Sequence, residues 1–459
     1  MKKRIVVIGG TAAGMSAAVR VKRLLPDSEV VVLERSGFIS YGSCGLPYYI
    51  GGIIESIHDL LSLTPETATE RGVDAKVYKE ALSIDRNSKN VVYKDIQSGK
   101  TSSISYDYLV IATGAVPVFP RLPNIDAAGV YTLRTIEDGL AIRKILDNNG
   151  AKRALIVGGG FIGLEMAEQF NHRGIEVSIL EALPRILPSF EEEYAGEIVK
   201  TLEDHGIRII SGQSLSAIET REGRAVAAVS DKGMRLDVDL IIISAGVRPN
   251  SDLARAAGLN IGYKGGIVVD DELKTSDDSI WACGDCVVMH NLITGKDTYV
   301  PLGTTANKQG RIVGGNIAGE RKNFNGVLGS QVTKVFDSYI ASTGLNLDAA
   351  IREGFDAVIE KIVKSDKASY YPRGVDCHLC LIFDRKTGRL LGAQAMGGIS
   401  VAGRINTLAV AITAGLSIQQ INEIDFVYAP PVAPVYDPIL IAASQGIKKI
   451  CQTDAESNI

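Results

Sequence analysis

The fold expected for this chain of 459 residues follows from one stretch, Arg153-Ala-Leu-Ile-Val-Gly158-Gly-Gly160-Phe-Ile-Gly163. Its apolar start predicts a buried strand over 153–157, and the residues that follow the glycines predict a helix that runs to about residue 173. In such a unit Gly158 makes the tight turn, Gly160 lets the backbone approach a pyrophosphate, and Gly163 lets the helix pack closely on the strand. The helix N-terminus favours the phosphate charge. The stretch therefore predicts a dinucleotide-binding unit.

The residues after this unit indicate which dinucleotide it takes. A second strand is predicted over 176–180 and ends at Glu181, about 18 residues after the glycines. A carboxylate there can accept hydrogen bonds from ribose hydroxyls and would repel a 2′-phosphate. We therefore expect NADH to be preferred over NADPH, and Arg185 keeps NADPH possible.

The pattern occurs a second time at the N-terminus. A strand over 3–9 leads into Gly9-Gly-Thr-Ala-Ala-Gly14, a helix is predicted to about residue 25, and a strand over 28–34 ends at Glu34. Thr11 stands where the middle glycine is expected. Because Glu34 is in place, we interpret this copy as a second dinucleotide site, with Ala12, Ala13 and Arg35 beside it. Two such sites in one chain favour FAD plus NAD(P)H, the usual pair for hydride relay.

The remaining motifs suggest several domains. We predict that the chain crosses between domains at two apolar strands, over 106–114 and 240–246, which end in Thr-Gly and Ala-Gly. From about residue 326, alternating strand patterns followed by helical patterns predict an α+β domain. We predict an FAD-binding domain over 1–115 and 249–325, an NAD(P)H-binding domain over 116–248, a dimerisation domain over 326–446 and a flexible tail over 447–459. The fold class expected is α/β, with two Rossmann-like three-layer domains, one inserted in the other, and a C-terminal α+β domain.

Composition excludes several classes of function. The net charge is −4 and the pI about 5.9, so neither nucleic acid nor an anionic membrane is an expected partner. No apolar run reaches about 18 residues, and the short apolar N-terminus predicts a strand rather than a signal peptide. Six cysteines do not form a disulfide framework, so we expect a reduced, cytoplasmic protein. The pairs Cys283/Cys286 and Cys377/Cys380 are not expected to bind metal.

One cysteine stands out in the segment Ser40-Tyr-Gly-Ser-Cys44-Gly-Leu-Pro-Tyr-Tyr-Ile-Gly-Gly52. If Cys44 begins a helix, the helix N-terminus would lower the thiol pKa and favour a reactive thiolate. The alternative is a cysteine buried as a small apolar side chain. The residues alone leave both open.

Jointly, the motifs resemble the FAD-dependent pyridine nucleotide–disulfide oxidoreductases over about residues 3–446. The matching segments are 9–14, 40–52, 112–114, 158–163, 282–285, 304–311 and 428–431. Two-cysteine members of that family carry C-x4-C where this chain has Cys44 and Tyr49. The chain is thus similar to the single-cysteine branch, which includes coenzyme A-disulfide reductases, coenzyme A-persulfide or polysulfide reductases, NADH oxidases and NADH peroxidases. Oxidases and peroxidases usually carry histidine where this chain has Ala12, which argues against peroxide as the acceptor.

The resemblance implies roles for further residues. Asp285 would hydrogen-bond the flavin ribitol, and a helix starting at 304–306 would face the flavin pyrimidine. In the coenzyme A branch the partner subunit brings tyrosines to the active-site sulfur, here Tyr428 and Tyr371, although packing in a dimer interface is the alternative. The cofactor-binding residues implied or expected are Gly9, Ala12, Ala13, Gly14, Glu34, Arg35, Ala112, Thr113, Gly114, Asp285, Thr304, Thr305 and Ala306 for FAD, and Gly158, Gly160, Phe161, Ile162, Gly163, Glu165, Glu181 and Gly246 for NAD(P)H.

The expected substrate is a small-molecule disulfide or persulfide. Arg20, Arg23 and Ser40 fall where coenzyme A reductases hold the nucleotide end of coenzyme A, though a solvated charged face explains the two arginines equally well. Electrons from NADH would pass through FAD to a mixed disulfide between Cys44 and coenzyme A, in a homodimer whose active site is shared. Two alternatives are an NADH oxidase or, less favoured, a peroxidase cycling Cys44 through sulfenic acid, and a reductase that feeds a protein partner.

Overall fold

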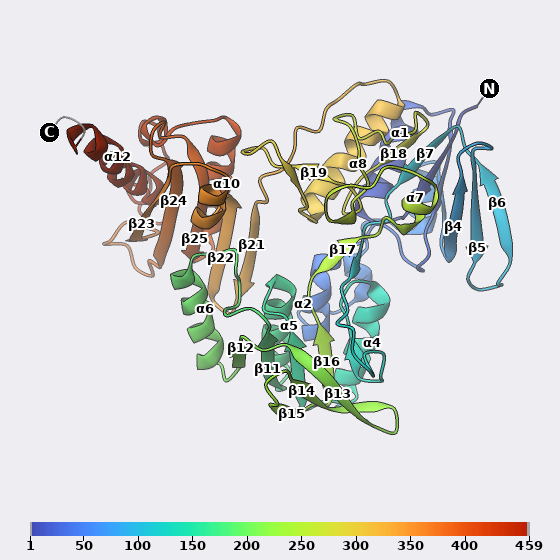
Figure 1. Ribbon diagram of the computed structural model, residues 1–459, viewed down its shortest axis with the longest axis horizontal. Helices are drawn as coiled ribbons and strands as arrows, with labels where there is room; N and C mark the ends of the chain where they lie inside the picture. Colours follow the sequence, from blue (N-terminus) through green and yellow to red (C-terminus); the bar gives the residue numbers. More distant parts are fainter. Residues whose placement is uncertain (1, 457–459) are drawn as a thin grey trace. The chain divides into compact units, whose positions relative to one another are not determined.

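The computed structural model describes residues 2–456, which form two compact units (Figure 1). The first unit holds the chain up to Ala151 together with Ile242–Asn291 and Lys296–Val327. The second holds Lys152–Ile241, Leu292–Gly295 and the chain from Leu328 onward. The segment with the second glycine loop therefore interrupts the first unit.

The first unit is built on a parallel sheet of order β18-β7-β1-β2-β3, in which the first four strands are buried on both faces and the edge strand β3 on one. Figure 1 shows α1 and α8 side by side on one side of this sheet and the antiparallel sheet β4-β5-β6 on the other. Its elements are β1 (Arg4–Ile8), α1 (Ala12–Leu24), β2 (Glu29–Leu33), α2 (Leu46–Gly51), α3 (Pro65–Glu70), β3 (Val73–Lys76), β4 (Lys79–Asp85), β5 (Asn90–Asp95), β6 (Thr101–Ser105), β7 (Tyr108–Ile111), β8 (Ala115–Pro117), β9 (Val130–Tyr131), α4 (Ile136–Asp147), β17 (Val247–Pro249), α7 (Asp252–Ala256), β18 (Ile280–Ala282), β19 (Met289–His290), β20 (Asp297–Thr298) and α8 (Gly303–Ile317).

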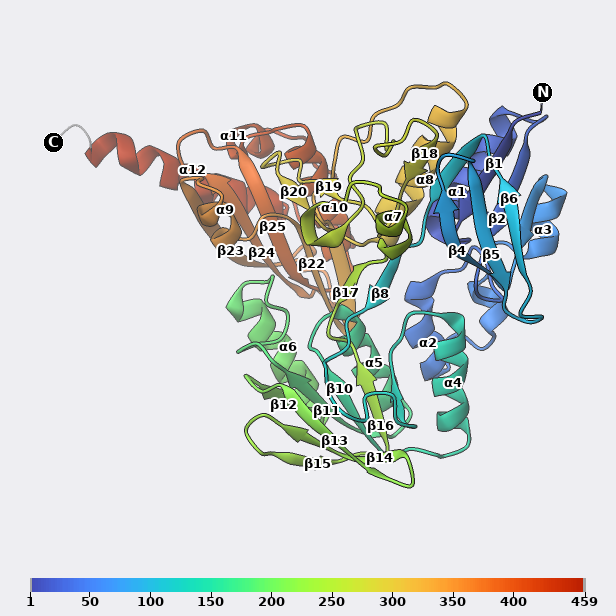
Figure 2. The ribbon, with the colours of Figure 1, turned by 45° about the vertical axis from the view of Figure 1, so that its right-hand side comes forward.

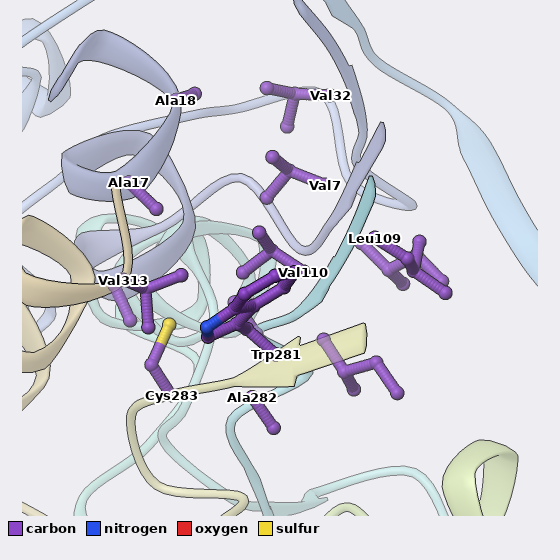
Figure 3. Packing of buried hydrophobic residues seen from close by; sticks show 14 of the residues in the cluster. Val7, Ala17, Ala18, Val32, Leu109, Val110, Trp281, Ala282, Cys283 and Val313 are labelled. Atoms are coloured by element: carbon purple, nitrogen blue, oxygen red, sulfur yellow. The ribbon is translucent and has the colours of Figure 1, made fainter. Parts of the chain in front are cut away.

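The core of the first unit lies between the sheet and the two helices. Figure 3 shows Val7 and Val110 of the sheet near Ala17 of α1 and Val313 of α8, all completely buried. Small residues allow α1 and α8 to approach closely: a Cβ added at Gly310 would lie 2.2 Å from the carbonyl oxygen of Ala13. This contact fixes the spacing of the two helices that flank the candidate site.

The second glycine loop belongs to a sheet of order β12-β11-β10-β16-β9, in which β11 pairs in parallel with both β10 and β12. Strand β10 covers the predicted 153–157, and β11 pairs with it in parallel over five residues. The elements of this part are β10 (Arg153–Val157), α5 (Phe161–His172), β11 (Glu176–Glu181), α6 (Glu192–Asp204), β12 (Arg208–Ser211), β13 (Leu215–Arg221), β14 (Arg224–Ser230), β15 (Arg235–Asp237) and β16 (Leu240–Ile243), where the chain returns to the first unit.

The remainder of the second unit is an antiparallel sheet of order β21-β22-β25-β24-β23. Helix α10 packs on β22 and β25, whereas α12 packs on β23 and β24 (Figure 2). The elements are β21 (Gln331–Val335), β22 (Ser338–Gly344), α9 (Leu347–Arg352), β23 (Ala357–Ser365), β24 (Asp376–Asp384), β25 (Leu390–Gly397), α10 (Ser400–Thr413), α11 (Ile418–Asn422) and α12 (Pro438–Glu456).

Two predicted boundaries differ from the structure. Residues 116–151 group with the first unit rather than with the second glycine loop, because α4 packs on α2. The backbone also stays helical to Glu456 where the sequence predicts a flexible tail, since Ile439, Ala442 and Ala443 bury one face of α12 and the ammonium of Lys449 pairs with Glu360 at 2.8 Å. Residues 457–459 of that tail lie outside the described residues.

Candidate active site

The first glycine loop joins β1 to α1 and is shaped by close backbone contacts. Gly9 has a φ of +101°, and a Cβ there would lie 2.2 Å from the carbonyl oxygen of Ala112. A Cβ on Gly14 would lie 1.9 Å from the carbonyl oxygen of Gly9. Both positions therefore require glycine. Ala12 and the buried Ala13 begin α1 just behind the loop.

Glu34 closes this loop from the end of β2. Its carboxylate is buried and accepts hydrogen bonds from the backbone N–H of Gly10 at 2.7 Å and of Ser36 at 2.8 Å. The backbone thus holds a carboxylate where the ribose of a dinucleotide is expected. Arg35, the next residue, is exposed.

A second group of predicted residues lies in the same unit. Oδ2 of Asp285 accepts a hydrogen bond from Arg134 at 3.1 Å, while Oδ1 of Asp285 is buried without a hydrogen-bond partner among the described residues. Thr113 donates to the carbonyl oxygen of Asn250 at 2.5 Å, which fixes the segment Ala112–Gly114. Thr304, Thr305 and Ala306 form the first turn of α8, where Thr304 is exposed and the other two are buried. The unpartnered oxygen of Asp285 indicates a ligand group that the protein itself does not supply.

The second glycine loop repeats this arrangement in the second unit. Gly158 has a φ of +112°, and the buried Glu181 accepts from the N–H of Gly159 at 2.7 Å and of Leu183 at 2.8 Å. Gly160 has an ordinary φ of −86°, and nothing lies within 4 Å of a Cβ built there. The protein itself therefore does not require glycine at 160, whereas close approach of a pyrophosphate would.

Glu165 lies one turn into α5, the helix that follows this loop. Burial raises the pKa of its carboxyl to about 7, although a hydrogen bond from Thr333 at 3.1 Å acts in the opposite direction. Phe161 packs near Phe190, and Ile162 is largely exposed. Gly246, which we expected to serve the same cofactor, belongs to the first unit and has a φ of +96°. Its role stays a prediction.

Cys44 differs from the other described cysteines. It lies in the single 3₁₀ turn Ser43–Gly45 that leads into the six-residue α2, and it is exposed. Burial raises the pKa of Cys286 and Cys377 to about 11 and that of Cys380 to about 12, and it also raises the pKa of Cys283. These four are poor nucleophiles at neutral pH, so Cys44 is the accessible thiol among the five cysteines whose side chains the structure describes. Tyr49, at the place of a second cysteine, is buried beneath Arg143.

A cavity of about 570 Å³ opens in the first unit beside α1 and α8. Arg20, Arg23 and Ser40, which the sequence analysis singled out, all line it, and Ser40 lies four residues before Cys44. Six of the thirteen lining residues are cationic and none is acidic. These are Arg20, Arg23, Arg71, Lys308, Arg311 and Lys322.

Glu320, just outside this lining, neutralises part of the charge. It forms ion pairs with Arg20 and with Lys322, and the hydrogen bond from Lys322 lowers the pKa of its carboxyl. Within residues 2–456, Arg23, Arg71, Lys308 and Arg311 have no ion-pair partner. The cavity thus suits a ligand with several negative charges.

The predicted tyrosines lie in the second unit, on two loops that touch. The backbone N–H of Ala368 donates to the carbonyl oxygen of Pro430 at 3.4 Å, which joins the loop 366–375 to the loop of Tyr428. The hydroxyl groups of Tyr370 and Tyr428 lie 2.8 Å apart. The hydrogen bond thus joins Tyr428 to Tyr370, while Tyr371, the other predicted tyrosine, is exposed next to it and its role stays a prediction.

A buried ion pair supports both tyrosine loops. Arg404 of α10 pairs with Asp437 at 2.8 Å, and both side chains are more than nine-tenths buried. Arg404 also donates to the carbonyl oxygen of Asp366 and to Ser400, which itself contacts the carboxylate of Asp366. The start of one loop and the end of the other are thus held by a single guanidinium group.

Comparison with known proteins assigns the family. Residues 3–310 match the model of the pyridine nucleotide-disulphide oxidoreductases, and residues 330–437 match the dimerisation domain of the same family. The chain belongs to this family. The membership confirms the predicted fold class, and it shows that the protein is an oxidoreductase that uses FAD and NAD(P)H.

Similar proteins have several names within that family. The chain is 40% identical to a protein named NADH oxidase from Methanocaldococcus jannaschii, over 97% of this chain and 99% of that one. It is 38% identical to a CoA-dependent NAD(P)H sulfur oxidoreductase from Pyrococcus furiosus, over 96% of this chain and 98% of that one. Among solved structures, the NAD-dependent persulfide reductase from A. fulgidus matches with a TM-score of 0.94 and 38% identity, over 98% of this chain and 84% of that one.

The residues of this member fit FAD in the first unit. The unpartnered oxygen of Asp285 is suited to a ribitol hydroxyl and the buried carboxylate of Glu34 to a ribose, while Gly9 and Gly14 let the chain turn tightly into the N-terminus of α1, where a pyrophosphate is expected. Sequence reasoning missed Arg134 beside Asp285, as well as Arg71, Lys308, Arg311 and Lys322 in the cavity. No helix in the described part of the chain has the length and apolarity needed to cross a membrane.

Proposed function

We propose that this protein uses NAD(P)H, through FAD, to reduce a coenzyme A disulfide or a coenzyme A persulfide or polysulfide at Cys44. The cationic cavity, which is lined by Ser40 of the cysteine segment, is the observation that carries the proposal. It is bounded by α1, the helix that follows the FAD loop, and by α8, whose first turn we assign to the flavin. The flavin, which supplies the electrons, and the anionic thiol compound would therefore bind in the same unit.

Charge and shape favour coenzyme A as the ligand. Coenzyme A carries a diphosphate and a 3′-phosphate on its nucleotide end and a thiol at the end of a long arm. Arg20 and Arg23 lie one turn apart on α1, while Lys308 and Arg311 lie one turn apart on α8. The close α1–α8 contact at Gly310 brings these cations to one cavity, where they would bind the phosphates.

Cys44 would act as the nucleophile. Its thiolate attacks one sulfur of coenzyme A disulfide, so that a Cys44–coenzyme A disulfide forms and a coenzyme A thiolate leaves. With a persulfide, attack on the sulfur bonded to carbon gives the same mixed disulfide and releases hydrosulfide. FAD, when bound, supplies transfer of two electrons from NAD(P)H, and Glu34, Asp285 and the first turn of α8 would hold it beside the cysteine segment. We further propose NADH as the preferred donor, because Glu181 would repel a 2′-phosphate.

The tyrosine pair would assist in a homodimer. We propose that a second copy of the chain brings its Tyr370 and Tyr428 to Cys44, as the family's dimerisation domain allows. The hydrogen bond with Tyr428 raises the pKa of Tyr370, so the Tyr370 hydroxyl stays protonated, and the hydroxyl pair can donate to the leaving thiolate. Tyr371 stays a weaker candidate for this role.

The test is anaerobic oxidation of NADH by the purified flavoprotein with coenzyme A disulfide and, separately, coenzyme A persulfide. We expect turnover that Cys44→Ser abolishes and that Arg23→Ala with Arg311→Ala weakens by raising KM for the coenzyme A substrate. Arg352→Ala, which removes one exposed charge from α9 in the second unit, is the control. Full disulfide reduction by Cys44→Ser would refute the proposal.

NADH oxidase activity is the second candidate, because a relative at 40% identity has that name and Cys44 is accessible. In that case Cys44 would cycle through sulfenic acid with oxygen as the acceptor. Ala12 at the start of α1 offers no imidazole beside the flavin. NADH consumption that requires air and ignores both coenzyme A substrates would establish the oxidase.

A further inference from the structure

Two glutamates one turn apart on α5 face the same strand, β21, but have different partners. Glu168 is almost completely buried and carries an ion pair with Lys334 at 2.7 Å, and it also accepts from the backbone N–H of Phe336 at 2.9 Å. A cation and a backbone donor thus satisfy this buried carboxylate. Glu168 therefore anchors α5 to β21.

Glu165 has a different environment. Its Oε1 accepts a hydrogen bond from the Thr333 hydroxyl at 3.1 Å. The charged groups beside it are Glu168 on its own helix and Lys334 on β21, whose ammonium is committed to Glu168. Burial and the charge of Glu168 raise the pKa of Glu165 to about 7, and the Thr333 hydroxyl opposes that rise. Helix α5 thus holds two different carboxylates. Glu168 forms an ion pair, whereas the ionised form of Glu165 is stabilised by the hydroxyl of Thr333.

The position of Glu165 connects this pair to the dinucleotide. Helix α5 begins at Gly160 and Phe161, where the second loop would hold the pyrophosphate, and Glu165 follows Phe161 by one turn on the same face. A carboxylate there can accept an N–H of the nicotinamide carboxamide, and the ionised form accepts it more strongly than the neutral acid.

We propose that Thr333, on the first strand after the glycine-loop domains, is a positioning residue that orients the Glu165 carboxylate for the nicotinamide amide. The inference rests on the proposed assignment of Glu165 to the nicotinamide side, but it does not depend on Cys44 or on coenzyme A. The hydroxyl of Thr333 donates to Oε1, which leaves Oε2 available to the ligand, and it stabilises the ionised form. A residue of the dimerisation domain thereby sets how well the nicotinamide half of the dinucleotide binds.

The experiment compares two ligands on the FAD-loaded protein. NAD⁺ carries the nicotinamide and ADP-ribose lacks it, so calorimetric dissociation constants for both, measured from pH 6 to 9, isolate the nicotinamide contact without turnover. The variants are Thr333→Val, which removes the hydroxyl at constant volume, and Thr333→Ser, which retains it. Thr343→Val is the matched control, because this buried threonine on β22 contacts Ser330 instead.

For the unaltered protein we expect NAD⁺ to bind more tightly as the pH rises through about 7 and ADP-ribose to show no such step. Thr333→Val should move the midpoint to higher pH and weaken NAD⁺ about five-fold at pH 7, because the ionised fraction of Glu165 falls. Thr333→Ser and Thr343→Val should behave as the unaltered protein, and ADP-ribose should bind all variants equally.

An unchanged pH midpoint and NAD⁺ affinity in Thr333→Val would overturn the inference, as would an equal loss for ADP-ribose. If Thr333→Val fails to retain flavin, Thr333→Ala is measured in the same way with the same criteria. A coenzyme A substrate that proves inactive would count against the proposed function alone, since neither ligand in this experiment involves Cys44.

Discussion

The two glycine loops, over 9–14 and 158–163, are copies that lie 149 residues apart, and they share their first two and last glycines but differ at the three central positions. Each has a positive φ at its first glycine, and each is closed by a glutamate that accepts two backbone N–H groups at 2.7 and 2.8 Å. The first carries Thr11 where the second carries Gly160. Because no protein atom lies within 4 Å of a Cβ at 160, the middle position is free of folding constraints. The difference separates glycines that the fold needs from a glycine that only a ligand needs.

The largest effect is expected at a glycine that the fold needs. Gly14→Ala places a Cβ 1.9 Å from a carbonyl oxygen, so α1 must move away from β1. We expect a loss of about 3 kcal/mol in the free energy of unfolding, together with loss of FAD. Chemical denaturation measures the first and flavin absorbance the second. Gly196→Ala, in an open position of α6, is the control and should be neutral or slightly stabilising.

Substitution of the two closing glutamates should affect the binding of the two cofactors separately. In Glu34→Gln and Glu181→Gln an amide replaces a carboxylate that accepts two N–H groups, so one accepting oxygen is lost. We expect Glu34→Gln to lose FAD, and Glu181→Gln to keep FAD but raise KM for NADH about ten-fold, since hydrogen bonds to charged groups contribute about 1.5–3 kcal/mol. Glu176→Gln, at the exposed start of β11, controls for charge. If each variant affected both cofactors equally, the two loops would not be separate sites.

A smaller effect is expected at the middle position. Gly160→Ala should leave the melting temperature unchanged, because its Cβ meets no protein atom, but it should raise KM for NADH about three-fold by crowding the pyrophosphate. Thr11→Gly in the first loop should leave the FAD content unaltered. A lower melting temperature for Gly160→Ala would mean that both loops constrain this position through the fold.

The smallest effect concerns the helices after the loops, where Ser16 of α1 corresponds to Glu165 of α5. The pKa of Glu165 in the folded protein is about 7 against an ordinary 4.5, so between these values the folded state binds more protons than the unfolded chain. Stability should therefore fall as the pH rises through that window, by about 1 kcal/mol at pH 8 for this partly screened group. Glu165→Gln should remove the fall and match the unaltered protein near pH 4.5. Glu197→Gln on the exposed face of α6 should retain it, and thermal unfolding against pH measures all three.

Much of the site followed from local patterns. The strands at 4–8 and 153–157, both glycine turns and the closing glutamates are set by residues within about 35 positions of one another, and all were predicted. Arg20, Arg23 and Ser40 were also predicted, and all three line one cavity. The spacing of Arg20 and Arg23 on one helix could indicate a common face, but not that this face borders a cavity rather than solvent.

The residues that sequence reasoning missed come from distant segments. Arg71 follows α3, Lys308 and Arg311 lie on α8, and Lys322 lies in the loop beyond it. No spacing connects them to Arg20, because the connection is the packing of α8 on α1. The choice of Tyr370 over Tyr371 as the partner of Tyr428 likewise depends on how two loops meet. The helical turns to Glu456 depend on burial of α12 against β23 and β24.

Local sequence patterns predicted the two dinucleotide units and the family, because glycine turns, strand lengths and a closing carboxylate act over short stretches of chain. The exposure of Cys44, which the residues alone left open, came from the structure. Only the tertiary structure decided which cations surround the cavity, which tyrosine hydroxyls pair, and that Thr333 contacts Glu165. Those outcomes depend on side chains that are up to about 300 residues apart in sequence and that become neighbours only when burial of the apolar surfaces of α1, α5, α8 and β21 brings their elements together.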